Sequence, residues 1–122
     1  MIQTSWFGQM SLPRELSVKN GRLYQEPVRD LEAMRRNEVR YMDVTFTDIL
    51  RLSGIHQRRS LVRHQNGRLR LRLILDRFSA ELFVNDGEQV LSATIYTDQG
   101  AEGILFFANG LVNMDVVKYD LV

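Results

Sequence analysis

The chain has 122 residues, of which 44% are hydrophobic and 25% are charged, a balance typical of one soluble globular domain. It contains no cysteine, which excludes disulfide bonds, thiolate metal sites and cysteine nucleophiles. A formal net charge of +1 argues against a dedicated nucleic-acid-binding protein, and no apolar run reaches the roughly 20 residues of a membrane span.

The N-terminal part of the chain predicts a β-hairpin. Residues 12–25 alternate in polarity on both sides of Asn20-Gly21, a dipeptide that accepts the positive φ angles of a type I′ turn. Pro27 is expected to end the second strand because proline has no N–H to donate to a ladder. Residues 28–36 carry apolar side chains at a spacing of three, which predicts one or two helical turns.

The middle of the chain returns to a period of two. Residues 41–46 predict one strand, and residues 69–75 predict another, in which leucines alternate with arginines. We expect Leu71 and Leu73 to face the core, because burying leucines at about 1.5–3 kcal/mol each is favoured over any register that buries guanidinium groups. Residues 80–96, with a turn at Asn85-Asp86-Gly87, predict a further hairpin.

The C-terminal part predicts two more strands. Residues 104–108 form a continuous apolar run, as in a strand that is covered on both faces. In residues 112–121 the apolar positions change phase, which predicts a β-bulge near Val116-Val117. The pattern as a whole is typical of an all-β, antiparallel β-sandwich, and residues 1–122 are interpreted as a single domain.

Positive charge is concentrated in one stretch. Between Arg58 and Arg77 there are seven arginines against one acidic residue, Asp76. The simplest interpretation places these arginines opposite acidic neighbours on adjacent strands, at about 0.2–1 kcal/mol per pair. A patch that binds a polyanion or phosphate, or an acidic protein surface, is the alternative.

Few residues have the spacing of a reactive site. His56 and His64 lack a carboxylate at ligand spacing, so no metal and no cofactor are expected. Asp76, Arg77 and Glu81 invite a catalytic interpretation, but an acid and a base at a strand end more often form a structural ion pair, and we expect one here.

Two dense segments carry a family resemblance: Leu12-Pro13-Arg14-Glu15-Leu16, followed by the Asn20-Gly21 turn, and Asp76-Arg77-Phe78-Ser79-Ala80-Glu81, followed by Asn85-Asp86-Gly87. Together they resemble the C-terminal β-sandwich module of glycoside hydrolase family 32, the β-fructosidases, over residues 6–36 and 68–121. The resemblance implies a concanavalin-like or lectin-like sandwich. It also implies a parent enzyme that hydrolyses sucrose, sucrose phosphate or fructan with a five-bladed catalytic propeller that this chain lacks.

The resemblance does not extend to the family's catalytic motifs, which are Asn-Asp-Pro-Asn, Arg-Asp-Pro and Glu-Cys. Here Asn85-Asp86 is followed by glycine, Arg29-Asp30 is followed by leucine, and cysteine is absent. A retaining glycosidase needs two carboxyl groups about 5–5.5 Å apart, and we identify no pair of carboxylates in this sequence as a candidate. We therefore assign no catalytic residue and expect the chain to be inactive by itself.

The first residues resemble the family's junction between propeller and sandwich. The resemblance implies that the chain starts where a catalytic domain would end, and that the module supports that domain through an interface. The expected interface residues are Trp6, Phe7, Met10, Arg14 and Glu15. An open interface of this kind predicts a homo-oligomer when the module is isolated. With no signal-peptide pattern, the chain is expected to be cytoplasmic.

Two questions stay open at the level of sequence. Related modules carry several more strands between positions equivalent to Arg58 and Arg68, so either this segment was lost or the numbering closes over omitted residues, and we expect the second. The alternative function is a stand-alone module that binds fructan or another sugar, with Trp6 and Tyr24 as a stacking platform. A core or interface role for these aromatic residues is the simpler interpretation.

Overall fold

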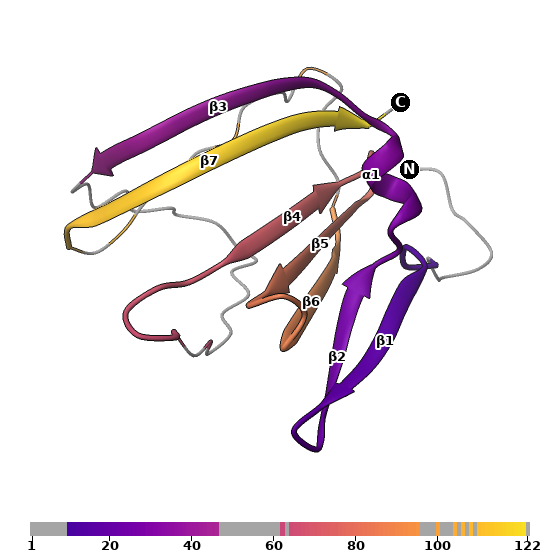
Figure 1. Ribbon diagram of the computed structural model, residues 1–122. Coiled ribbons are helices and arrows are strands. Elements are labelled where there is room, and N and C mark those ends of the chain that lie inside the picture. Colours follow the sequence, from indigo (N-terminus) through magenta and orange to yellow (C-terminus); the bar gives the residue numbers. More distant parts are fainter. Residues whose placement is uncertain are drawn as a thin grey trace. The chain divides into compact units, whose positions relative to one another are not determined.

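The computed structural model describes residues 10–46, 62, 64–95, 100, 104, 106, 108 and 110–121. Within this part, every strand pairs antiparallel with its neighbour, and the predicted all-β, antiparallel β-sandwich class is confirmed (Figure 1). The expected covered strand at residues 104–108 is not found at its described positions: residues 104, 106 and 108 belong to no strand, Ile104 and Phe106 are 46% and 52% exposed, and the other two positions lie outside the described residues. The elements are β1 (Arg14–Lys19), β2 (Arg22–Pro27), α1 (Asp30–Ala33), β3 (Arg35–Phe46), β4 (Leu71–Leu75), β5 (Ser79–Val84), β6 (Gln89–Thr94) and β7 (Val112–Leu121).

The described elements fall into two compact units, and each is described by itself. The first unit holds the hairpin β1–β2 and the sheet β4–β5–β6, and the second holds α1, β3 and β7. Helix α1 has four residues and lies within the segment that predicted one or two helical turns.

The hairpin β1–β2 follows the sequence prediction closely. Asn20 and Gly21 have φ angles of 50° and 72°, the positive values that a type I′ turn needs at both central positions. The ladder runs from Lys19 opposite Arg22 to Arg14 opposite Pro27, which is the last residue of β2. The turn and the proline therefore fix the two ends of the hairpin.

The sheet β4–β5–β6 has β5 as its central strand. Leu73 lies opposite Leu82 in the β4–β5 ladder, and Glu81 lies opposite Ser92 in the β5–β6 ladder. Because side chains alternate along a strand, Leu73 and Leu82 occupy one face of the sheet and Glu81 and Ser92 occupy the other. The turn between β5 and β6 begins with Asn85, Asp86 and Gly87, all with positive φ angles.

The buried apolar side chains among the described residues are Phe83 and Val84 in β5. The prediction that Leu71 and Leu73 are buried in the core is wrong: they keep 52% and 45% of their surface exposed. The hairpin β1–β2 reaches the opposite face, that of Glu81 and Ser92. Val84, which lies opposite Leu71 on the leucine face, is fully buried, so this face is covered at Val84 and half exposed at Leu71 and Leu73.

In the second unit, β3 and β7 form a two-stranded sheet with two irregularities. The register shifts between Arg36 and Val39 and again between Tyr41 and Val44, so the extra residues belong to β3. Asn37 and Asp43, which lie inside these shifts, have φ angles of 52° and 56°. Asparagine and aspartate tolerate this left-handed conformation better than other non-glycine residues.

The predicted bulge near Val116-Val117 is therefore misplaced. These two residues of β7 pair with Tyr41 and Arg40 without interruption, and the register shifts flank that pairing on β3. The change of apolar phase along β7 correctly indicated a bulge in this strand pair, but the bulge was assigned to the wrong strand. A bulge in either strand changes the register of both.

Candidate functional site

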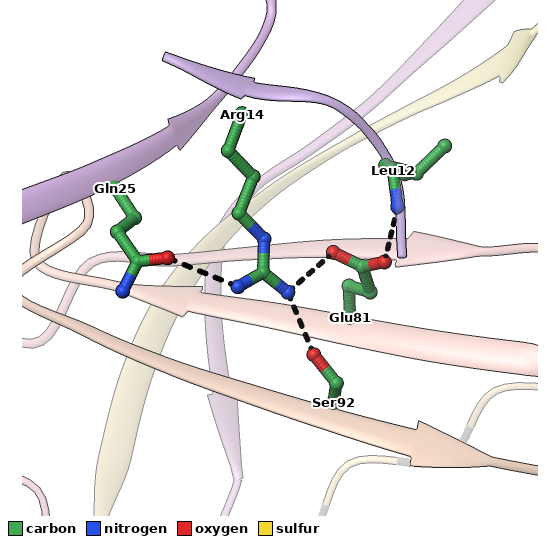
Figure 2. A network of polar contacts seen from close by, with 5 residues as sticks. All are labelled: Leu12, Arg14, Gln25, Glu81 and Ser92. Atoms are coloured by element: carbon green, nitrogen blue, oxygen red, sulfur yellow. Dashed lines mark hydrogen bonds and ion pairs between the residues drawn. The ribbon is translucent and has the colours of Figure 1, made fainter. Parts of the chain in front are cut away.

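The candidate site is a polar cluster where the hairpin β1–β2 meets the sheet β4–β5–β6 (Figure 2). It joins Arg14, the first residue of β1, to Glu81 in β5. Gln25 of β2, Ser92 of β6 and the backbone of Leu12 complete the cluster. Five residues that are far apart in the sequence thus meet at one guanidinium and one carboxylate.

The Arg14 guanidinium donates to three acceptors on three strands. Its Nη1 lies 3.1 Å from Gln25 Oε1, and its Nη2 lies 3.0 Å from Glu81 Oε2 and 2.7 Å from Ser92 Oγ. The Phe83 ring lies beneath it, with 5.6 Å between the guanidinium carbon and the ring centroid. A planar fork of N–H groups suits this arrangement, whereas a lysine ammonium has the charge without the geometry.

Glu81 is the buried partner. Its side chain keeps only 3% of its surface exposed, against 18% for Arg14. One carboxylate oxygen accepts from the Arg14 guanidinium, and the other accepts from the Leu12 backbone N–H at 2.7 Å. Each oxygen of this buried carboxylate therefore has a hydrogen-bond donor, as buried polar groups require.

One donor of the cluster has no acceptor. The Arg14 Nε is buried and makes no hydrogen bond. Removing one partner of a buried ion pair typically costs about 3–5 kcal/mol, whereas replacing both partners by apolar side chains can be neutral. The cluster is therefore a specific connection between the hairpin and the sheet. Glu81 is the one carboxylate among its five residues, so the cluster does not supply the two carboxyl groups that a retaining glycosidase needs.

The expected ion pair among Asp76, Arg77 and Glu81 has a different composition. Glu81 binds Arg14. Asp76 Oδ1 accepts from the Arg77 backbone N–H at 2.7 Å, as in a turn, and the Arg77 guanidinium lies over the Phe78 ring at 5.2 Å from its centroid. Residues 76 and 77 precede β5, whereas Glu81 projects from within it, toward the hairpin.

The expected interface residues have three different settings. Trp6 and Phe7 lie outside the described residues, and Met10 is 92% exposed. Arg14 is bound inside the module. Glu15 Oε1 accepts from both the backbone N–H and the Nε of Arg29, each at 3.0 Å.

These contacts lower the pKa of the Glu15 carboxyl, with the Arg29 backbone N–H as the largest cause and the Arg29 side chain as the next.

Tyr24, the second member of the expected stacking platform, is half-buried, and the Lys19 ammonium lies 5.0 Å from the centroid of its ring. One side of that ring is thus already in contact with a cation.

Of the seven arginines in the arginine-rich stretch, the structure describes those from position 68 onward. Arg70 forms an ion pair with Asp86 at 2.9 Å, as expected for arginines that face acidic neighbours. Arg72 lies opposite Phe83 in the β4–β5 ladder. In the described ranges, no helix is long and apolar enough to cross a membrane, and no three histidine or acidic side chains come together as metal ligands.

Sequence reasoning missed the partners of Arg14. It identified Arg14 and Glu81 separately, each inside a dense segment of the family resemblance, but did not connect the two segments. The available signal was the presence of charged residues at strand positions that a plain hairpin does not require. Gln25 and Ser92 carried no signal, since isolated polar residues on strands are common.

Comparison with known proteins gives the family. Residues 32–121 match the family described as "Glycosyl hydrolases family 32 C terminal". The chain is 25% identical to sucrose-6-phosphate hydrolase of Staphylococcus xylosus over 173 positions, which cover 95% of this chain and 35% of that protein. It is 32% identical to sucrose-6-phosphate hydrolase of Klebsiella pneumoniae over 136 positions, which cover 84% of this chain and 29% of that protein.

A shorter match is closer. Over 50 residues, 40% of this chain and 7% of the relative, the chain is 44% identical to levanase of Bacillus subtilis (strain 168). No significant match to a solved structure was found. The match to the Staphylococcus xylosus protein runs over 173 positions against 122 residues here, so at least 51 positions of that match have no counterpart in this chain.

The chain spans about a third of the length of the sucrose-6-phosphate hydrolases that it matches. The family match covers most of the chain, including β3 to β7, and the Arg14 cluster extends the same module to the hairpin before it. The chain belongs to glycosyl hydrolases family 32, and its matched region is the C-terminal domain of that family.

Proposed function

We propose that this chain is the accessory C-terminal domain of a β-fructosidase that hydrolyses sucrose, sucrose phosphate or fructan, and that it supports a catalytic propeller through an interface. The names of the relatives, sucrose-6-phosphate hydrolase and levanase, support this class of substrate. The share of those relatives that the chain spans supports the role of one domain of a larger enzyme. We also propose that it acts in the cytoplasm.

The observation that carries the proposal is the attachment of the segment before β1. By resemblance, residues 6–12 lead from the catalytic domain into the module. Glu81 accepts from the Leu12 backbone N–H, and Arg14 binds Glu81 two residues later. The point where the chain enters the module is therefore held on the sheet, and exposed Met10 remains for the interface.

In this role, Arg14 and Glu81 act as positioning residues. A flexible entry would let the two domains move apart, whereas an entry bonded to β5 limits the orientations that the interface must select. The chemistry belongs to carboxylates on the partner domain. When the module is isolated, the same apolar residues favour self-association, so we also propose a homo-oligomer.

The test replaces the matching third of Staphylococcus xylosus sucrose-6-phosphate hydrolase by this chain. The chimera is compared with the same enzyme lacking that third, through soluble yield, Tm and hydrolysis of sucrose 6-phosphate. We expect the chimera to exceed the truncated enzyme in all three measurements. Glu81→Ala in the chimera should remove the gain, and Glu38→Ala, at an exposed position of β3, should keep it.

A second measurement does not depend on a folded chimera. The purified chain is incubated with sucrose, sucrose 6-phosphate and levan, and released reducing sugar is measured. We expect no sustained turnover. Hydrolysis by the chain that disappears with Glu81→Gln would contradict the accessory role, as would a truncated enzyme as stable and active as the chimera.

A further inference from the structure

A hollow of about 500 Å³ lies where the strand connection before β4 meets the turn between β5 and β6. This volume falls within the roughly 300–1,000 Å³ that small-molecule sites occupy. The hollow belongs entirely to the first unit, and its lining surface is mostly polar. The lining residues are Gln65, Asn66, Arg68, Arg70, Asn85 and Asp86.

One wall of the hollow is a tight turn fixed by its own backbone. The N–H of Gln65 donates to the Arg68 carbonyl at 2.8 Å, and the N–H of Arg68 donates back to the Gln65 carbonyl at 2.9 Å. Asn66 and Gly67 between them have φ angles of 52° and 74°, as in a type I′ turn. His64 Nδ1 accepts from the Gly67 N–H at 3.1 Å.

The opposite wall is held by a buried asparagine. Asn85 is 5% exposed; its N–H donates to the Arg70 carbonyl at 2.8 Å, and its Oδ1 accepts from the Arg70 N–H at 3.2 Å. At position 87 only glycine fits against the hairpin, because a Cβ there would lie 2.1 Å from the Gln25 carbonyl oxygen. The hairpin therefore constrains the residues that follow Asn85. Both walls are thus set before any ligand arrives.

The polar groups of the hollow differ in their availability. The Arg70 guanidinium already binds the Asp86 carboxylate at 2.9 Å. The Arg68 guanidinium makes no ion pair or side-chain hydrogen bond with the described residues. The Gln65 carboxamide already donates one N–H to Glu88 Oε2 at 3.5 Å and keeps its oxygen and a second N–H, and the Asn66 carboxamide offers both a donor and an acceptor.

This set favours a neutral ligand with many hydroxyl groups. An apolar ligand would desolvate the polar lining without replacing its hydrogen bonds. An anion would gain from Arg68 but would face the Asp86 carboxylate, whose partner Arg70 it would have to draw away. A sugar hydroxyl can donate to the Asp86 carboxylate and accept from the Arg68 guanidinium in the same complex.

We propose that this hollow is a saccharide-binding site, with Arg68 as donor, Asp86 as acceptor and Gln65 bridging neighbouring hydroxyl groups. It is distinct from the aromatic platform expected at Trp6 and Tyr24, and it does not depend on the accessory role proposed above. No aromatic ring lines the hollow, so binding lacks the stacking contribution and we expect a weak affinity, with Kd on the order of 1 mM.

The experiment titrates the full 122-residue chain, labelled with ¹⁵N, with sucrose, fructose, glucose or inorganic phosphate. We expect saturable shifts of the backbone amides of residues 65–70 and 85–86 with at least one sugar. Arg68→Ala should weaken that binding about tenfold, the loss expected for a hydrogen bond to a charged donor. Arg77→Ala, an arginine outside the lining, should leave the Kd unchanged.

Asp86→Asn separates the two ligand chemistries. Asn retains the size of the side chain and tolerates the φ angle of 58° at this position, while the carboxylate charge is removed. Weaker sugar binding by this variant is the expected result. The proposal is overturned if no sugar produces localised shifts, or if phosphate alone binds and Asp86→Asn strengthens it. The spectrum of each variant without ligand shows whether it is folded.

Discussion

The hairpin β1–β2 and the strand pair β3–β7 are held by different means. The first is tied to another sheet through a guanidinium and a carboxylate that are largely shielded from water. The second carries exposed polar contacts along its own length, such as Asn37 to Asp120 at 2.9 Å and Asn113 to Asp43 at 2.7 Å. In this comparison, the pair that is shielded from water joins one sheet to another, whereas the exposed pairs connect the two strands of one sheet.

The largest expected effect is at the buried pair. Glu81→Ala should lower the free energy of unfolding by about 3–5 kcal/mol, because it leaves the Arg14 guanidinium and the Leu12 N–H without their acceptor. Glu38→Ala is the matched control, since Glu38 pairs with Arg40 on the exposed surface of β3, and its effect should be much smaller. Denaturant titration measures both.

The double variant Arg14→Met with Glu81→Leu sharpens this comparison. If the charge alone makes the single variant costly, the apolar pair should recover most of the loss. An equal loss for Glu81→Ala and Glu38→Ala would remove the distinction between the two regions.

The second effect concerns the bulge in β3. Asp43→Val should lower stability by about 1–2 kcal/mol, because a β-branched residue is poorly suited to the left-handed conformation with a φ angle of 56°. Asp43→Asn should change it by less than about 0.5 kcal/mol, since asparagine accepts this conformation. Thermal unfolding followed by circular dichroism compares the two variants. Equal Tm values for both would show that the bulge does not constrain the residue.

The third effect measures the exposed leucine face. Leu73→Ala should cost about 1 kcal/mol, well below the roughly 2–5 kcal/mol of a buried leucine, because 45% of its surface is exposed. Phe83→Ala, at a buried position of the same sheet, should cost about 3–5 kcal/mol. A denaturant titration in which the two substitutions cost the same would indicate that the leucine face is covered in solution.

The smallest effect is a pH dependence in both regions. Arg29 lowers the pKa of Glu15 in the first unit, and the Arg40 side chain lowers that of Glu38 in the second. Each carboxylate therefore stabilises the folded state above its ordinary pKa of about 4.3, and this contribution is lost as the pH falls through the lower folded value. Glu15→Gln and Glu38→Gln should each flatten the dependence of Tm on pH below about 4. Unchanged slopes would show that neither contact matters for stability.

Local rules predicted the hairpins well. Asn20-Gly21 and Asn85-Asp86-Gly87 adopt the positive φ angles that their residue types favour, and both turns lie where the sequence places them. The same rules predicted the short α1 and the end of β2 at Pro27. These features depend on a few neighbouring residues, so the information needed to predict them lies close together in the chain.

Long-range features were less accessible. Glu81 was expected to belong to a structural ion pair with Asp76 and Arg77, but its partner is Arg14, because side chains on one face of β5 meet whichever element packs there. The leucine face was expected to be inside because its pattern resembles a buried strand, and amphipathicity does not show whether a covering element exists. The bulges of β3 were attributed to β7 because either strand of a pair can produce the same phase change.

The separation of Arg14 and Glu81 by 67 positions affects when their contact forms. The β1–β2 hairpin closes over two turn residues, whereas joining it to β5 closes a long loop, and such closures are slow and become favourable only after local structure exists. We therefore expect the ion pair to be absent from the folding transition state. Contacts that form after the barrier act on the unfolding rate, so the two family segments would set the lifetime of the folded module and not the speed with which it appears.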